Sequence, residues 1–94
     1  MSTNLRKFAR GKECQLRLPG ICNFDTATTV LAHVRRGGVA GMGQKPPDIC
    51  GIHSCADCHD AMDGRSSWKN TPSDTDVLEG LNRTLAVVSK ELDL

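Results

Sequence analysis

The sequence predicts a small α+β domain that is held together by a bound zinc ion. The chain has 94 residues, of which 38% are hydrophobic and 3% aromatic, so its apolar core is expected to be thin. Five cysteines offer a second source of stability. The apolar pattern indicates a strand, a loop, a strand and a helix within residues 28–64, followed by a long C-terminal helix. Residues 1–94 are therefore interpreted as one domain.

The first element, in residues 14–22, is a short loop with a cysteine at each end. Its sequence, CQLRLPGIC, is interrupted by Pro19 and Gly20, a dipeptide that favours a turn because glycine accepts a positive φ. A tight loop or small hairpin is expected. We interpret residues 14–22 as a zinc-binding loop.

The central elements follow from runs of apolar residues separated by glycine and proline. Residues 28–34 are β-branched and apolar, which predicts a strand with His33 near its end. Residues 35–47 contain four glycines and two prolines and are expected to form an open, basic loop. A second strand is predicted over residues 48–52 and a helix over residues 55–63, ended by Gly64.

The C-terminal element is predicted to be an amphipathic helix over about residues 74–92. Ser73 can cap it, and the first turn is acidic. Gly80 weakens the helix by about 1 kcal/mol relative to alanine. The apolar stripe is expected to close the core, with a dimer interface as the less favoured use. That stripe recurs every three or four residues at Leu78, Leu81, Leu85, Val88 and Leu92.

The composition excludes some cellular settings and favours others. No apolar run reaches the roughly 18 residues of a membrane span, and the basic N-terminus is not followed by an apolar segment of signal-peptide length. A cytoplasmic protein without a membrane partner is therefore expected. In a reducing compartment, closely spaced cysteines are metal ligands more often than disulfides.

Four of the cysteines have a spacing that suits a zinc site. Cys55 and Cys58 form a C-x-x-C motif, and Cys14 and Cys22 form a wider pair upstream. Two thiolates from each of two segments give the four ligands of a tetrahedral structural Zn²⁺ site. The alternative is that these thiols are small buried apolar groups. Cys50 is left over and fits an apolar position in the second strand.

The string CADCH at residues 55–59 also matches the attachment motif of a c-type haem. A haem would need export and a second axial ligand, and it would leave Cys14 and Cys22 unexplained. The haem interpretation is therefore set aside in favour of zinc.

The charges are unevenly distributed although the net charge is only +1. Eight of the twelve Lys and Arg residues lie in residues 1–45, with only two of the eleven acidic residues. This asymmetry points to a surface for a polyanion such as DNA, while ordinary solvated charges are the alternative. Arg35, Arg36 and Lys45, in the glycine-rich loop, are the predicted phosphate contacts.

A His at a strand end, a basic loop, a second strand and a helix opened by Cys-x-x-Cys-His together resemble the ββα-metal nucleases, also called the HNH or His-Me finger superfamily. The whole chain is more similar still to the YbcO-type nucleases of prophages, from about Leu5 to the C-terminal helix. The matching stretches are LRK at residues 5–7, ARGKECQ at 9–15, LAH at 31–33, KPPD at 45–48 and CADCHD at 55–60. The resemblance implies a zinc-containing ββα-metal (HNH-like) core.

The resemblance also implies roles for individual residues. His33 corresponds to the general base that activates water, and His59 to a ligand of a catalytic cation such as Mg²⁺ or Mn²⁺. Asp63 lies four residues after His59 on the same helical face and is the expected second ligand. Asp48, the nearest polar candidate on the second strand, would hold the tautomer of His33.

The sequence departs from the HNH pattern just before the expected base. Most HNH enzymes have a metal-binding Asp, Glu or His there, whereas this chain has Ala32. Fewer protein ligands and more water are then expected around the cation. His53 is a further possible ligand outside the matched helix.

We therefore expect a metal-dependent DNA endonuclease that uses a histidine base and a divalent ion. The alternative is a zinc-finger-like nucleic-acid-binding module without catalysis. In that case His33 is a structural strand-end residue, His59 belongs to the zinc site, and Asp63 is a solvated helix residue. The sequence leaves open the substrate form (double-stranded, branched or single-stranded DNA, or RNA) and the oligomeric state.

Overall fold

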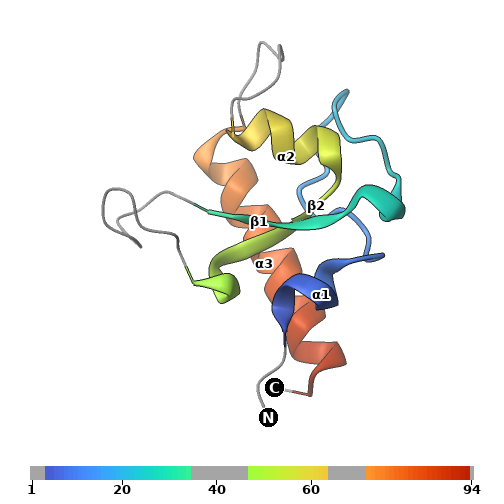
Figure 1. Ribbon diagram of the computed structural model, residues 1–94. Helices are drawn as coiled ribbons and strands as arrows, with labels where there is room; N and C mark the ends of the chain where they lie inside the picture. The colour runs from blue at the N-terminus through green and yellow to red at the C-terminus, as the bar shows by residue number, and fades with distance from the viewer. Residues whose placement is uncertain (1–3, 35–46, 64–71, 94) are drawn as a thin grey trace.

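The computed structural model describes residues 4–34, 47–63 and 72–93, and shows a small α+β fold built on a two-stranded sheet (Figure 1). Strand β1 is Val30–His33 and strand β2 is Gly51–Ser54. They pair antiparallel, with Ala32 opposite Ile52 and His33 opposite Gly51. Because side chains alternate across a strand, Ala32 and Ile52 share one face of the sheet and His33 lies on the other.

Helix α3, Asp74–Glu91, packs behind the sheet (Figure 1). Ser73 and Asp76 form a capping box at its start, because each side chain accepts a hydrogen bond from the other residue's backbone N–H. A Cβ atom on Gly80 would lie 3.3 Å from Cγ2 of Ile52 and 3.2 Å from Cδ1 of Leu16. The missing side chain at Gly80 therefore allows the close approach of α3 to the sheet.

The buried face of α3 differs from the predicted stripe. Its buried residues are Val77, Gly80, Thr84 and Val88, while Leu78 and Leu85 are exposed. Compared with the predicted orientation, α3 is turned about its axis so that Gly80 and Thr84 face the sheet. Thr84 Oγ1 accepts a hydrogen bond from the backbone N–H of His53 at 3.1 Å, which holds this orientation. The expectation that Leu78 and Leu85 close the core was wrong.

Two 3₁₀ turns shorten the predicted strands. Thr26–Thr28 is capped by the side chain of Asp25, so β1 begins only at Val30. Asp48–Cys50 forms the second turn, in which the backbone N–H of Cys50 donates to the carbonyl of Pro47 at 2.9 Å. The prediction of a strand over residues 48–52 was therefore wrong at its start, and both Asp48 and Cys50 precede β2.

Two helices complete the described structure. Helix α2, Ala56–Asp63, follows β2 after Cys55 and occupies the segment predicted as the helix of residues 55–63. Helix α1, Leu5–Ala9, was not predicted, because five residues are too few for a periodic apolar signal. Asn4 caps α1 by accepting hydrogen bonds from the backbone N–H groups of Arg6 and Lys7.

The core lies between α3, β2, α2 and the loop of residues 14–22. Within that loop the backbone N–H of Cys22 donates to the carbonyl of Leu18 at 2.9 Å, and Gly20 has φ 73°, as a turn requires. Cysteines contribute to the core beside apolar side chains, and the core members include Leu16, Leu18, Val34, Ile52, Val77, Cys14, Cys55 and Cys58. No helix in the described part of the chain is long and apolar enough to cross a membrane.

Candidate functional site

Four cysteine side chains converge at one point of the core. The Sγ atoms of Cys14, Cys22, Cys55 and Cys58 all lie within 4.8 Å of one another, and those of Cys22 and Cys55 are 3.8 Å apart. Zn–S bonds of about 2.3 Å in a tetrahedron give S–S separations of about 3.8 Å. All five cysteines of the chain are free thiols. The four clustered cysteines could therefore hold a metal ion such as zinc.

Hydrogen bonds already favour a thiolate within the cluster. The pKa of Cys14 is lowered to about 4, chiefly because its sulfur accepts a hydrogen bond from the thiol of Cys58. Donating that bond raises the pKa of Cys58, and burial raises the pKa of Cys22 to about 11. A metal ion must displace the protons from such thiols when it binds.

The cluster is framed by two segments with matching backbone geometry. The backbone N–H of Arg17 donates to Sγ of Cys14, and that of Cys58 donates to Sγ of Cys55, each at 3.4 Å. The two donors follow their sulfur acceptors by three residues, so each segment curls around a sulfur atom. Cys50 lies outside the cluster, in the 3₁₀ turn before β2.

A second cluster of polar side chains, formed by His33, Asp48 and Arg6, lies at the end of β1. Nε2 of His33 is 2.7 Å from Oδ1 of Asp48, and the imidazole is only 9% exposed. The hydrogen bond from His33 lowers the pKa of Asp48, and the nearby Arg6 guanidinium adds to this effect. Nε of Arg6 is 3.4 Å from the same carboxylate oxygen. Strand β1, the 3₁₀ turn and helix α1 thus meet at one carboxylate.

Gly51 shapes the sheet beside this arrangement. It is the β-ladder partner of His33, and a Cβ atom there would lie 2.5 Å from Cδ1 of Leu31 and 3.1 Å from the carbonyl oxygen of Asp48. The absence of a side chain at Gly51 lets the Asp48 turn lie close to β1.

A third group, the pair His59 and Asp63, lies on α2. Nε2 of His59 is 3.0 Å from Oδ2 of Asp63, and both side chains are partly exposed. The distance is that of a direct contact between the imidazole and the carboxylate, and adjacent ligands of an octahedral cation with bonds of about 2.1 Å have a similar separation. Among the described residues, only the four cysteines form a group of three or more potential ligands.

Other expected ligands are placed away from these groups or cannot bind. His53 is buried within β2, where its ring packs against Phe8 at 5.8 Å between centroids. Burial lowers the pKa of His53, and its Nδ1 has no hydrogen-bond partner among the described residues. Ala32 is fully buried. The predicted phosphate contacts Arg35, Arg36 and Lys45 lie outside the described residues.

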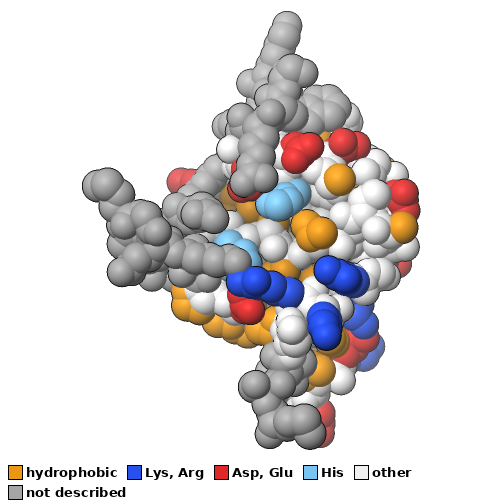
Figure 2. Space-filling model, viewed as in Figure 1, with side chains coloured by type: hydrophobic (Ala, Val, Ile, Leu, Met, Phe, Trp, Pro, Cys, Tyr) orange, Lys and Arg blue, Asp and Glu red, His pale blue; other side chains and the backbone are white. Residues whose placement is uncertain are grey.

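A cationic surface lies on α1, within the basic first half of the chain for which a polyanion-binding surface was predicted. Arg6, Lys7 and Arg10 are all exposed on or directly after this helix, which packs against β1 and the Asp48 turn. Figure 2 shows Lys and Arg side chains gathered beside histidine side chains on one face of the molecule. The cluster LRKFAR at residues 5–10 was visible as charge, but its position beside His33 depends on tertiary packing.

The chain is similar to a family model and to two known proteins that share one description. The family model described as "Putative nuclease YbcO" matches residues 3–92. Proteins with that same description from Escherichia coli (strain K12) and Enterobacteria phage 82 are each 45% identical to this chain over 89 residues, which is 94% of this chain and 93% of theirs.

A solved structure is also similar to this one. This structure, described as "Structure of a putative bacteriophage protein from Escherichia coli str. K-12 substr. MG1655", superposes with a TM-score of 0.72 at 38% sequence identity. The match covers 95% of this chain and all of the other. Because the family model and both relatives cover almost its whole length, the chain belongs to the Putative nuclease YbcO family.

Proposed function

We propose that this protein is a metal-dependent endonuclease that hydrolyses DNA phosphodiester bonds at a ββα-metal (HNH-like) site. The hydrogen bond between His33 and Asp48 carries this proposal. A mostly buried imidazole fixed by a carboxylate at a strand end is the arrangement that general-base catalysis needs. The nuclease description of the family supports the same conclusion.

His33 is the proposed general base, and Asp48 is its positioning residue. A carboxylate beside Nε2 favours the tautomer in which Nε2 carries the proton and donates it in the hydrogen bond. The lone pair is then on Nδ1. In the proposed reaction Nδ1 takes a proton from the attacking water while Asp48 keeps the ring in place.

His59 and Asp63 are the proposed ligands of a divalent cation such as Mg²⁺ or Mn²⁺. Their separation of 3.0 Å suits adjacent ligand positions. When bound, the cation supplies charge neutralisation at the phosphate and at the leaving 3′ oxygen. With two protein ligands and a methyl group at Ala32, most of the coordination falls to water, as is usual for Mg²⁺.

The cysteine cluster is proposed to hold a structural Zn²⁺ ion, which needs all four positions filled by protein. The exposed cations of α1 are proposed to contact the DNA backbone beside His33, together with Arg35, Arg36 and Lys45 of the glycine-rich loop. Such contacts orient the duplex or strand without reading its sequence.

Cleavage of plasmid, branched and single-stranded DNA in Mg²⁺ and in Mn²⁺ tests the proposal. His33→Ala should reduce the rate by about 10²- to 10⁴-fold while zinc content and DNA affinity persist. His59→Ala and Asp63→Ala should instead recover part of their lost rate at high cation concentration. Asp60→Ala, on the same helix, is the matched control and should cleave like the unchanged protein.

The competing proposal is a zinc-finger-like nucleic-acid-binding module. The two-ligand pair on α2 and the buried Ala32 favour it, because many catalytic cation sites have more protein ligands. If the protein binds DNA but cleaves it with none of these cations, or if His33→Ala cleaves at the full rate, the binding module replaces the nuclease.

A further inference from the structure

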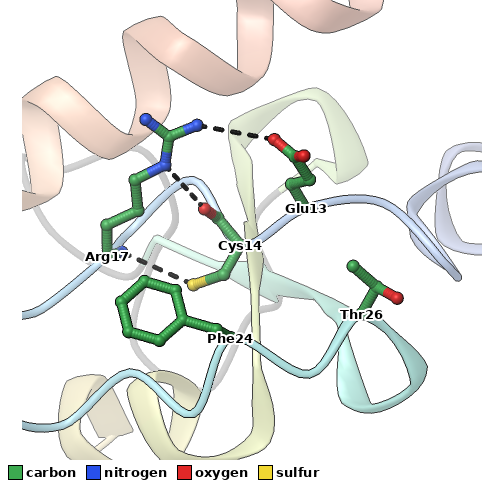
Figure 3. A pocket seen from close by; sticks show the side chains of 5 residues that line it. All are labelled: Glu13, Cys14, Arg17, Phe24 and Thr26. Carbon is green, nitrogen blue, oxygen red and sulfur yellow. Dashed lines mark hydrogen bonds and ion pairs between the residues drawn. The ribbon is translucent and has the colours of Figure 1, made fainter.

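We infer that a pocket beside the cysteine cluster binds an unpaired nucleobase, which makes DNA with a single-stranded segment the preferred substrate. The pocket has a volume of about 390 Å³ and is lined by Glu13, Cys14, Arg17, Phe24 and Thr26 (Figure 3). That volume is within the range of small-molecule sites, which is roughly 300–1,000 Å³. The inference about the substrate rests on the proposed nuclease function.

Phe24 is the residue that points to a base. Phe24 is 79% exposed, although it is one of only three aromatic residues of the types Phe, Trp and Tyr in the chain. Its φ of 56° is in the left-handed region, where a bulky side chain is unfavourable and Gly or Asn is preferred.

The backbone of Phe24 has a structural role, but its ring has none in the core. The backbone N–H of Phe24 hydrogen-bonds the Cys22 sulfur and counteracts the rise in its pKa. Any residue with a backbone N–H could make this bond, and Gly would do so with less strain. Neither the turn nor the packing therefore explains a phenyl ring here, whereas a stacking surface does.

The same pocket also contains polar groups that can hydrogen-bond the edge of a base. Nε of Arg17 donates to the carbonyl of Cys14 at 3.0 Å, and its NH2 group lies 3.8 Å from Oε2 of Glu13. These contacts hold the guanidinium at the pocket, and Figure 3 shows it beside Glu13 and the Cys14 carbonyl, with the Cys14 side chain between it and the Phe24 ring. Guanidinium and carboxylate groups can hydrogen-bond base edges while an aromatic ring covers the face.

This combination selects unpaired bases over paired ones. In a duplex both faces of each base are covered by neighbouring bases, so a protein ring can stack only on a base that has left the helix or was never paired. Stacking tolerates any base, because every base has a π face. The expected ligand is thus a single-stranded segment of any sequence.

The pocket lies within reach of the proposed catalytic residue. Thr26 lines the pocket, and His33, at the end of β1, follows it by seven positions in the sequence. An extended chain of that length spans at most about 25 Å. With roughly 3.4 Å per nucleotide along one strand, the bound base lies within about seven nucleotides of the phosphate that His33 would serve.

Binding without cleavage tests this inference directly. Fluorescence anisotropy with a labelled 12-nucleotide single strand, and with its duplex, is measured with zinc-loaded protein and no added Mg²⁺ or Mn²⁺. Phe24→Ala should weaken single-strand binding by about 5- to 150-fold, as expected for the loss of one stacked base, and leave duplex binding unchanged. Leu78→Ala removes another exposed apolar side chain and should change neither affinity.

Phe24→Trp provides a spectroscopic readout. In a Trp68→Phe background the introduced indole is the single tryptophan of the chain, and stacking on a base should quench its emission while affinity is retained. Phe24→Leu keeps apolar bulk without a π face and should weaken binding as Phe24→Ala does. If Phe24→Ala loses zinc, its weaker binding could reflect lower stability. Phe24→Leu then tests stacking alone, because it keeps the apolar bulk.

The inference is overturned if Phe24→Leu binds the single strand as tightly as the unchanged protein, or if single strand and duplex weaken equally. Quenching of the indole emission of the Phe24→Trp variant by a peptide but not by DNA would likewise assign the pocket to another class of ligand. Failure of the nuclease proposal has a different signature, in which single strands bind through Phe24 but no cation supports cleavage.

Discussion

Nε2 of His33 and Nε of Arg6 approach the same oxygen of Asp48, at 2.7 Å and 3.4 Å. One carboxylate therefore joins the end of β1 to α1, although Arg6 and Asp48 are 42 residues apart in sequence. His33 has most of its surface covered, while Arg6 and Asp48 are accessible to solvent. The pair His33–Asp48 is thus a fixed unit, and Arg6 is the partner that a phosphate could draw away.

The first prediction concerns the carboxylate of Asp48. Asp48→Asn should lower the rate of plasmid cleavage by about 10²- to 10⁴-fold, because a neutral amide does not fix the tautomer with its proton on Nε2. The double variant with His33→Ala should be no slower than His33→Ala alone, since the two residues act as one unit. Multiplicative losses in the double variant would show that Asp48 acts independently of His33.

The second prediction is an acid-dependent loss of stability. The hydrogen bond from His33 lowers the pKa of Asp48 below its ordinary value of 3.8, so the ionised carboxylate stabilises the folded state above about pH 4. This contribution is lost as the pH falls through the lower folded-state pKa. The difference in urea-unfolding free energy between the unchanged protein and Asp48→Asn should therefore shrink below pH 4.

His33→Ala provides the control for this pH dependence. It removes the largest cause of the lowered pKa of Asp48, so the acid-dependent difference should be much smaller in its background. An equally large difference without His33 would assign the effect to Arg6 or to another group.

The third prediction separates the clustered cysteines from Cys50. Cys14→Ser should lower the zinc content below one ion per chain and reduce the thermal midpoint, because Cys14 belongs to both the cluster and the core. Cys50→Ser should leave the zinc content and the thermal midpoint unchanged, because Cys50 lies outside the cluster. Elemental analysis and circular dichroism melts provide the measurements, and an unchanged Cys14→Ser protein would contradict the metal site.

The fourth prediction is that zinc affinity rises steeply with pH. The pKa of Cys22 is raised to about 11 and that of Cys58 is also raised, so at least these two thiols lose protons when metal binds. The apparent Kd should therefore fall by at least about 100-fold per pH unit between pH 6 and 8. Competition with a chromophoric chelator measures this dependence, and a change below tenfold per unit would contradict it.

The fifth prediction tests the cationic surface of α1. Replacing both Lys7 and Arg10 with alanine should reduce the slope of log affinity against log salt by about 2, because two phosphate contacts are lost. Lys90→Ala removes an exposed cation from the last turn of α3 and is the matched control. An unchanged slope in the double variant would exclude α1 from the DNA interface.

The sequence indicated the parts of this fold that depend on local spacing. The C-x-x-C motif placed two thiols in one turn, and Ser73 marked the start of α3, because both signals act over three or four residues. The i, i+4 spacing of His59 and Asp63 likewise placed the two side chains together on α2.

The parts that depend on contacts between distant segments were not predictable in this way. The apolar stripe of α3 suggested that Leu78 and Leu85 face inward, yet the close approach at Gly80 turns a different face to the sheet. Pro47 starts a turn that holds Asp48 before β2 rather than within it. Arg6 reaches Asp48 only because α1 packs on β1, and no local pattern records that contact.

Cys58 and His59 are consecutive residues of α2, and the backbone N–H of His59 donates to the carbonyl of Cys55 at 2.9 Å. The first turn of α2 thus carries Cys58, a member of the cysteine cluster, and His59, the first member of the proposed cation pair. If zinc binding orders α2 at the proposed cation pair, it strengthens cation binding, and the cation then strengthens zinc binding by the same factor. On the proposed assignment of both sites, removal of zinc is then expected to weaken cation binding at His59 and Asp63 as well.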